Sequence, residues 1–149
     1  GRSIIATAGL TLYKLGSRKE IPGVKTYISV DGGMSDNPRP ITYQSAYTAC
    51  LVDQPLADAK ELVTIVGKHC ESGDILLKDY RLPLSASGDV LAVFGTGAYN
   101  LSMSSNYNRI PRPASVLVEN GNAELVQKRE LPEDLLRYDI LPDRFIAKG

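Results

Sequence analysis

Apolar and polar residues alternate at the start of the chain, which is the period of a β-strand. The alternation covers residues 3–15 and predicts one long strand. Residues 16–23 contain glycine and proline and predict a turn, and residues 24–30 alternate again. We therefore expect a second strand that pairs with the first and ends at the glycine turn 31–33.

The middle of the chain mixes short apolar runs with polar loops. Residues 34–44 contain two prolines and predict a loop with about one helical turn. Clusters of β-branched and other apolar residues predict short strands at 47–52, 62–66, 75–77 and 90–94. Residues 70–74 form a loop in this interpretation. Residues 95–110 are too small and polar to be core, so we expect a functional loop or short helix there.

A hairpin is the clearest feature of the last third. Asn120-Gly121 separates two strand-like runs, 114–118 and 123–129, and both residues accept positive φ. A helix is predicted to open at Pro132 and continue to about residue 138. The whole pattern predicts a mostly β domain, a barrel or sandwich of about seven strands with one or two short helices.

Composition narrows the class of protein. The chain has 149 residues, of which 43% are apolar and 23% charged, so it fits one domain with a buried core. Seventeen basic and seventeen acidic residues argue against a general nucleic-acid binder. The apolar runs are far shorter than the roughly 20 residues of a membrane span, and the first residues lack a signal-peptide pattern. With only two cysteines, we expect a soluble cytoplasmic domain.

Cys70 and Glu71 are the first candidates for chemistry. A thiol at the end of a predicted strand can donate a proton when its pKa is tuned, and the adjacent carboxylate can hold an ammonium group. A buried small thiol beside a turn is the competing interpretation. His69 is the only histidine and cannot build a metal site alone, so no metal site is predicted.

Arg39 and Tyr99 are candidates for ligand binding. Arg39 lies between two prolines and four residues before Tyr43, and a fixed guanidinium can bind a carboxylate through two N–H groups. An isolated loop arginine is nevertheless usually solvated. Tyr99 follows two glycines at the end of a predicted strand, where a phenol can stack on a ring or bind a phosphate. The alternative is an aromatic plug beneath a loop.

Five sequence blocks share one order with the motifs of a known family. They are Gly1-Arg2, Asp31-Gly32-Gly33-Met34, Arg39-Pro40 with Tyr43, Cys70-Glu71-Ser72-Gly73-Asp74, and Gly97-Ala98-Tyr99 followed by 102–108. This arrangement resembles the C-terminal domain of the diaminopimelate decarboxylase family, pyridoxal-phosphate decarboxylases with the alanine-racemase-like fold. The resemblance runs from residue 1 to about 138, and it implies that residues 1–149 are that β domain with a short tail.

The resemblance implies a role for each matching residue. Arg2, Arg39 and Tyr43 would bind the substrate, chiefly its distal carboxylate, and Glu71 would hold its distal amino group. Cys70 would donate a proton to the decarboxylated carbon. Tyr99 would contact cofactor and substrate, and Gly1 the cofactor. The implied reaction converts meso-2,6-diaminopimelate to L-lysine and CO2, the last step of lysine biosynthesis, in a homodimer with shared active sites.

The resemblance also implies what this sequence lacks. In the family, pyridoxal 5'-phosphate is bound mainly by an N-terminal (β/α)8 barrel, and no lysine here lies in a matching cofactor motif. We therefore expect a fragment that is inactive alone. Two alternatives stay open: the equivalent domain of an ornithine, arginine or carboxylated-polyamine decarboxylase, or a non-catalytic regulatory relative. Related ornithine and arginine decarboxylases typically have Asp where this chain has Glu71, which favours the diaminopimelate interpretation.

Overall fold

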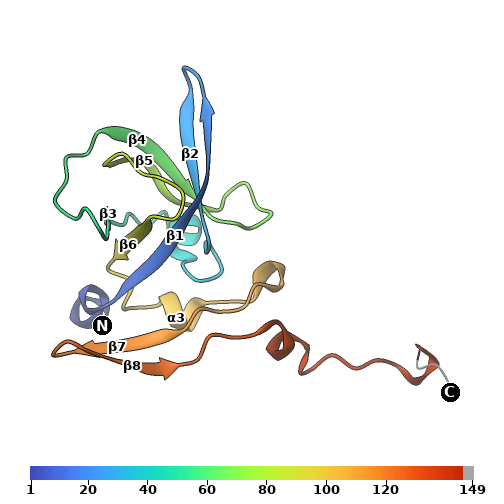
Figure 1. Ribbon diagram of the computed structural model, residues 1–149. Helices are drawn as coiled ribbons and strands as arrows, with labels where there is room; N and C mark the ends of the chain where they lie inside the picture. Colours follow the sequence, from blue (N-terminus) through green and yellow to red (C-terminus); the bar gives the residue numbers. More distant parts are fainter. Residues whose placement is uncertain (146–149) are drawn as a thin grey trace. The chain divides into compact units, whose positions relative to one another are not determined.

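The computed structural model describes residues 1–145, which divide into two compact units, the first Gly1–Ser105 and the second beginning at Asn106. The first unit contains a six-stranded sheet in the order β3-β6-β1-β2-β4-β5, and the second contains the hairpin β7-β8. Helices are few and short (Figure 1). The mostly β, barrel-like fold predicted from the sequence is confirmed.

The first unit contains six strands and a few short helices. Its strands are β1 Leu10–Ile21, β2 Lys25–Val30, β3 Ala49–Leu51, β4 Glu61–Val66, β5 Ile75–Leu82 and β6 Val90–Phe94. Its helices are α1 Arg2–Ile5, the 3-10 turn η1 Ala6–Ala8, α2 Arg39–Tyr43 and α3 Asn100–Met103. Strands β2, β4 and β6 lie where the sequence pattern predicts them.

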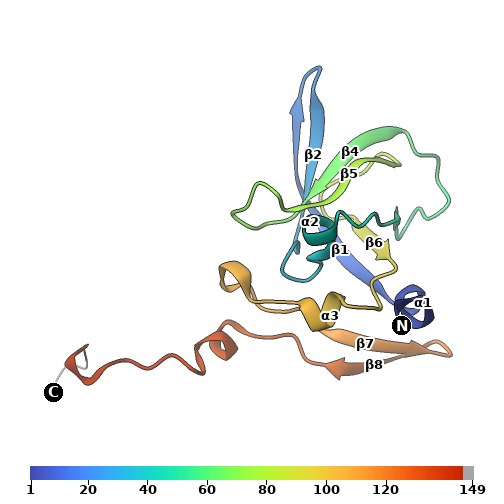
Figure 2. The same ribbon diagram turned by 180° about the vertical axis from the view of Figure 1, so that it is seen from behind.

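Strand β1 organises the sheet because it pairs on both sides. Its first half is antiparallel to β6 and its second half is antiparallel to β2. Strand β2 then pairs in parallel with β4, and β4 pairs antiparallel with β5. Figure 1 shows β1 crossing the unit from α1 to the projecting β1–β2 hairpin, and Figure 2 shows α2 beside β1.

A side chain joins the two ends of this curved sheet. The Tyr80 hydroxyl on β5 donates to the Ala49 carbonyl on β3 at 2.9 Å and accepts the Ala49 N–H at 2.8 Å. The core inside the curve draws on every strand of the unit, and its buried members are Tyr13, Leu15, Ile28, Val30, Leu51, Val63, Ile65, Leu76, Leu77, Leu82, Leu91 and Val93. The sheet therefore wraps one apolar core, which holds the loops at its rim in place.

The prediction of a strand over residues 3–8 is wrong, because α1 and η1 occupy this stretch. The reason is a distant contact. The Ala6 carbonyl accepts the Gly97 N–H at 3.0 Å, and the Gly9 carbonyl accepts the N–H groups of Gly95 and Thr96. A Cβ atom on Gly9 would collide with the Gly97 backbone. These bonds occupy polar groups that a strand ladder would require, so the regular strand begins only at Leu10.

The turn predicted at residues 16–20 is also wrong, because β1 continues to Ile21. Gly16 marks a β-bulge instead: the pairing register with β2 shifts between Leu15 and Arg18. A Cβ atom on Gly16 would lie 2.6 Å from the Ser29 hydroxyl oxygen, which accepts the Ser17 N–H at 2.8 Å. Glycine thus makes room for a cross-strand bond, and the predicted turn occurs later, at residues 22–24.

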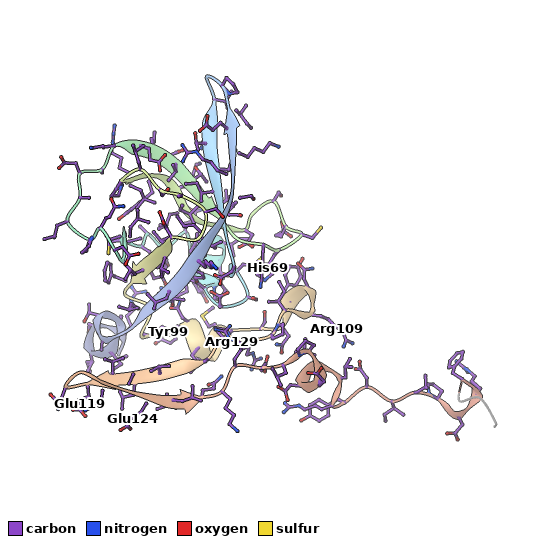
Figure 3. All side chains as sticks on the ribbon, viewed as in Figure 1. His69, Tyr99, Arg109, Glu119, Glu124 and Arg129 are labelled. Atoms are coloured by element: carbon purple, nitrogen blue, oxygen red, sulfur yellow. The ribbon has the colours of Figure 1, made fainter. Side chains whose placement is uncertain are left out.

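The second unit is built around the predicted hairpin. Strands β7 Ser115–Glu119 and β8 Asn122–Gln127 pair antiparallel, and Asn120 and Gly121 have φ of 50° and 77°. Short 3-10 turns lie at η2 Tyr107–Arg109, η3 Pro132–Leu136 and η4 Asp143–Phe145. The helix expected from Pro132 to about 138 is therefore a shorter 3-10 turn. Arg109 pairs with Asp139 at 3.0 Å within this unit (Figure 3).

Across residues 1–145, the structure contains no helix with the length and apolar character of a membrane span.

Candidate functional site

Arg39 lies at the start of α2, and its side chain is held in a defined place. Pro38 and Pro40 flank it and restrict the backbone, and the helix ends after one turn at Gln44, which has φ of 53°. Arg39 is only 9% exposed, so it is not the solvated loop arginine of the competing interpretation. Its Nη2 group donates to the Ser45 hydroxyl at 3.2 Å. The guanidinium is therefore fixed by local structure.

Two aromatic rings contact this guanidinium. The Arg39 Cζ atom lies 5.4 Å from the ring centroid of Tyr43 and 5.6 Å from that of Tyr99. Tyr99 comes from a segment distant in the sequence, directly before α3, and has a left-handed conformation with φ of 68° (Figure 3). Its side chain is half-exposed, which contradicts the interpretation of a buried plug. Ring faces attract cations, so the three side chains form a cation–aromatic cluster.

Gly1 adjoins the cation–aromatic cluster of Arg39, Tyr43 and Tyr99. A Cβ atom built on Gly1 would lie 3.9 Å from the Tyr99 hydroxyl oxygen. Four of the seven predicted site residues thus lie in one neighbourhood. Arg2 is exposed on α1, and the structure shows no hydrogen bond or ion pair between Arg2 and another predicted site residue among residues 1–145.

The positive charge of Arg39 has no carboxylate near it among residues 1–145. Within residues 1–145 no carboxylate lies within ion-pair distance of Arg39, so its positive charge is met only by ring faces and a hydroxyl group. Arginine is seldom buried without an anion. The arrangement is therefore suited to an external carboxylate or phosphate, which a guanidinium binds through paired N–H groups.

Cys70 and Glu71 lie on the connection between β4 and β5, residues 67–74. Both are exposed, which contradicts the interpretation of Cys70 as a buried thiol. The connection contacts α2, because a Cβ atom on Gly73 would lie 2.6 Å from Ile41 Cδ1. Glu71 Oε1 accepts the Gly73 N–H at 3.3 Å, and no ion pair joins Glu71 to Arg2 or Arg39 in the described part of the chain. The loop and the arginine helix are therefore neighbours, although no ion pair joins Glu71 to Arg39 within residues 1–145.

Sequence reasoning missed the buried acids beneath this surface. Asp74 is 3% exposed and accepts hydrogen bonds from Met34 and His69. Asp36 accepts bonds from the Tyr13 hydroxyl and from the Gly33 N–H. Asp36 and Asp74 were placed in loops by their sequence context. The only signal in the sequence was the adjacent glycine pair, and a glycine pair also fits an ordinary turn.

Burial changes the acid–base behaviour of the deeper pair. Burial is the main cause that raises the pKa of the Tyr13 phenol well above its usual value, with the Asp36 charge next. Burial likewise raises the pKa of the Asp36 carboxyl, although the Tyr13 hydroxyl and the Gly33 N–H both favour its charged form. The pair is therefore a structural brace for the turn after β2, because it lies in the protein interior away from exposed Cys70.

A groove of about 720 Å³ runs beside α2 and β5. Ile41 and Gly73 line it, but none of the seven predicted site residues does. The groove is therefore separate from the predicted site residues, although it adjoins them through α2. Residues 1–145 also hold no group of three or more His, Cys, Asp or Glu side chains arranged for a metal ion.

The site combines a curved β domain with a fixed cation, two aromatic rings and an exposed thiol loop, which defines a domain suited to contact an anionic ligand. The sequence matches the family described as pyridoxal-dependent decarboxylase, C-terminal sheet domain, over residues 4–97. The chain belongs to this family. That confirms the family resemblance drawn from the five sequence blocks.

Individual relatives agree with the family. The chain is 56% identical over 147 residues to diaminopimelate decarboxylase of Synechocystis sp., covering 99% of this chain and 31% of the relative. It is 55% identical over 140 residues to the Bacillus subtilis enzyme of the same name, covering 94% and 32%. The crystal structure of M. jannaschii diaminopimelate decarboxylase with L-lysine superposes with a TM-score of 0.91 at 39% identity, covering 98% and 33%. The chain thus spans about a third of the length of these relatives.

Proposed function

We propose that this chain is the substrate-recognition and dimerisation domain of a diaminopimelate decarboxylase, called the full-length parent below. The parent would convert meso-2,6-diaminopimelate to L-lysine and CO2, and this domain would be inactive alone. The names of the relatives support the reaction. The M. jannaschii relative was crystallised with L-lysine, which is the product that the reaction would release.

The observation that supports substrate recognition most directly is Arg39. Its guanidinium is buried, oriented by Ser45 and flanked by Tyr43 and Tyr99, and it has no carboxylate partner among residues 1–145. Diaminopimelate differs from lysine by a second carboxylate at its distal end. A fixed guanidinium without a protein anion is the group required to bind that carboxylate.

The remaining predicted residues complete a site for a zwitterion. Arg2 and Tyr43 would assist Arg39 with the distal carboxylate, and Glu71 would hold the distal ammonium group through its exposed carboxylate. Cys70 would give its thiol proton to the carbon that has lost CO2. This division follows from charge, because a substrate end with both signs needs a cation and an anion at separate fixed positions. The proposal is supported by the two charges that this chain offers, a fixed cation at Arg39 on α2 and an exposed carboxylate at Glu71.

Pyridoxal phosphate is the cofactor that the family implies, and this chain fits contact with part of it. Tyr99 presents a half-exposed ring and hydroxyl, and Gly1 leaves open space beside that hydroxyl. When bound, the cofactor withdraws electron density from the carbon that loses its carboxylate. Tyr99 would contact the cofactor and substrate, while residues outside this chain would hold most of the cofactor. The dimeric assembly is likewise part of the proposal, with Cys70 and Glu71 serving the partner subunit's cofactor.

Replacement of Arg39 in the full-length parent tests the substrate assignment. Arg39→Ala should lower kcat/KM for diaminopimelate by about ten- to a hundredfold or more, since a hydrogen bond to a charged group contributes about 1.5–3 kcal/mol. Residual action on lysine, which lacks the distal carboxylate, should be spared. Arg18→Ala is the control for loss of an arginine, because Arg18 lies on β1 outside the cluster and, unlike Arg39, pairs with a carboxylate of the protein, that of Glu61.

The competing functions give different results in the same assay. Equal losses on substrates with and without the distal carboxylate would show that Arg39 is structural. Product from ornithine but not from diaminopimelate would assign the parent to a sibling decarboxylase. A parent that binds cofactor but releases CO2 from none of these substrates would indicate the regulatory alternative.

A further inference from the structure

A buried carboxylate, that of Asp74, contacts the connection between β4 and β5 from inside. Asp74 Oδ1 accepts the Met34 N–H at 2.7 Å, and Oδ2 accepts the His69 N–H at 3.0 Å. The same Oδ2 lies 2.7 Å from His69 Nδ1, and both side chains are almost fully buried at 0% and 2% exposure. Nδ1 and Oδ2 are therefore within hydrogen-bond distance of each other. Asp74 Oδ1 therefore holds the turn after β2 through Met34, and Oδ2 holds His69, the residue before Cys70.

Two glycines shape the space around this carboxylate. A Cβ atom on Gly33 would lie 2.5 Å from Asp74 Oδ2 and 2.7 Å from His69 Nδ1, and one on Gly67 would collide with the carboxylate itself. The glycine turn and the loop are thus in contact through Asp74. Because no other residue type leaves this space open, the position of the carboxylate is set by both backbones.

The turn that receives this contact is itself tied to the core. A Cβ atom on Gly32 would lie 2.5 Å from the Tyr13 ring, and Gly33 N–H donates to Asp36 at 2.9 Å. Lys68 N–H donates to the Gly32 carbonyl at 3.0 Å. A continuous set of contacts therefore leads from Tyr13 on β1, through the glycine turn, to His69, which precedes Cys70 (Figure 3).

We propose that Asp74 and His69 are positioning residues that hold the Cys70–Glu71 backbone in the orientation required for proton donation and for binding the distal ammonium group. The inference rests on the proposed function, which it deepens by assigning the buried pair that supports those two groups. Asp74 and His69 act through their neighbours and touch neither substrate nor cofactor. Their effect comes from preorganisation, because a loop that must be ordered during each turnover loses rate.

Substitutions that differ in one hydrogen-bonding atom test this inference in the full-length parent. In His69→Asn, the amide nitrogen is the same number of bonds from Cα as Nδ1 and can donate to Asp74, whereas His69→Leu has no donor. In Asp74→Asn, an N–H group would face the His69 N–H donor. Glu61→Gln is the matched control. Glu61 is a buried acid at the start of β4, where it accepts bonds from Ser85.

The first readout is hydrogen exchange of a peptide covering residues 68–74, which does not depend on catalysis. We expect exchange to rise about tenfold or more in His69→Leu and Asp74→Asn, and to stay near the parent rate in His69→Asn and Glu61→Gln. Unchanged exchange in Asp74→Asn would overturn the inference. This result is informative even when the parent fails to decarboxylate diaminopimelate, an outcome that would refute the proposed function separately.

The second readout is a double-mutant cycle with Cys70→Ser. His69→Leu should lower kcat by about tenfold in the parent, His69→Asn should restore most of it, and Glu61→Gln should leave kcat unchanged even where it lowers the melting temperature. In the Cys70→Ser background, His69→Leu should change the residual kcat less than about twofold, because its effect passes through Cys70. Equal losses in both backgrounds would show a general structural role and overturn the inference.

Discussion

Removal of one buried hydroxyl should loosen the turn after β2 in a pH-dependent way. Tyr13 is 2% exposed, and its hydroxyl donates to Asp36. Tyr13→Phe keeps the ring in the core and deletes only this donor. Within residues 1–145, the Asp36 carboxylate then keeps the Gly33 N–H as its hydrogen-bond donor.

The size of the effect follows from the charge on the acceptor. A hydrogen bond to an ionised group contributes about 1.5–3 kcal/mol, and a buried acceptor that loses its donor costs a similar amount. Since 1.4 kcal/mol is about tenfold in an equilibrium constant, local opening of the turn should become about ten- to over a hundredfold more frequent. Hydrogen exchange of the amides in residues 31–37 of the full-length parent measures this opening directly.

The sign of the pH dependence is set by both raised pKa values. Asp36 has a raised pKa in the folded state, so its contribution to stability is full at low pH and is lost as pH rises through that pKa. Tyr13→Phe removes a donor that favours the charged form, so it raises the pKa of Asp36 further. The exchange ratio of variant to parent should accordingly be larger at pH 7 than near the ordinary carboxyl pKa of about 4.

Tyr13 itself adds a second, alkaline dependence. Its raised pKa means that stability is full below the usual phenol value of about 10 and falls as pH increases beyond it, a loss that the Phe variant lacks. Tyr27→Phe on β2 is the control, because its half-buried hydroxyl makes no hydrogen bond within the described residues. Equal exchange ratios for the two variants, or a ratio without pH dependence, would refute the assignment of Tyr13 as the brace of Asp36.

Two further predictions concern the dimer and the binding of the cofactor. One full-length variant carries Cys70→Ala, and the other lacks the cofactor lysine. After random subunit exchange their mixture should recover roughly a quarter of normal activity, because half of the dimers are mixed and each mixed dimer has one intact site. No recovery despite confirmed exchange would place Cys70 in its own chain's site. The isolated chain should bind pyridoxal phosphate weakly, since Tyr99 and Gly1 provide few contacts, and one-to-one micromolar binding in equilibrium dialysis would contradict this expectation.

Local sequence pattern predicted the elements whose structure is local. Strand β6 matches the predicted residues 90–94, and the hairpin turn has positive φ at Asn120 and Gly121 as its sequence requires. The start of β1 could not be predicted, because its helical turns depend on Gly97, which is almost ninety residues away. Gly16 was assigned to a turn for a similar reason, since its bulge is defined by Ser29 on the partner strand.

In the candidate site too, features set by neighbouring residues were predictable, and features set by distant residues were not. The prolines around Arg39 indicated a fixed backbone, but its burial depends on Tyr99, which another loop supplies. Asp74 and Asp36 both contact Gly33, and the glycine pair in the sequence does not reveal these contacts because it also fits an ordinary turn. Residue types therefore identified the exposed chemistry, while the buried supports became visible only in three dimensions.

The Tyr80 hydroxyl that joins β5 to β3 also has a consequence for solubility. The phenol occupies both the N–H and the carbonyl of Ala49, two groups that β3 would otherwise offer to any extended chain nearby. A sheet whose outermost strands present unoccupied amides is a template on which a neighbouring molecule can add a strand. The Tyr80 side chain thus occupies the outer edge of β3, and together with the short length of this three-residue strand it disfavours the addition of another strand.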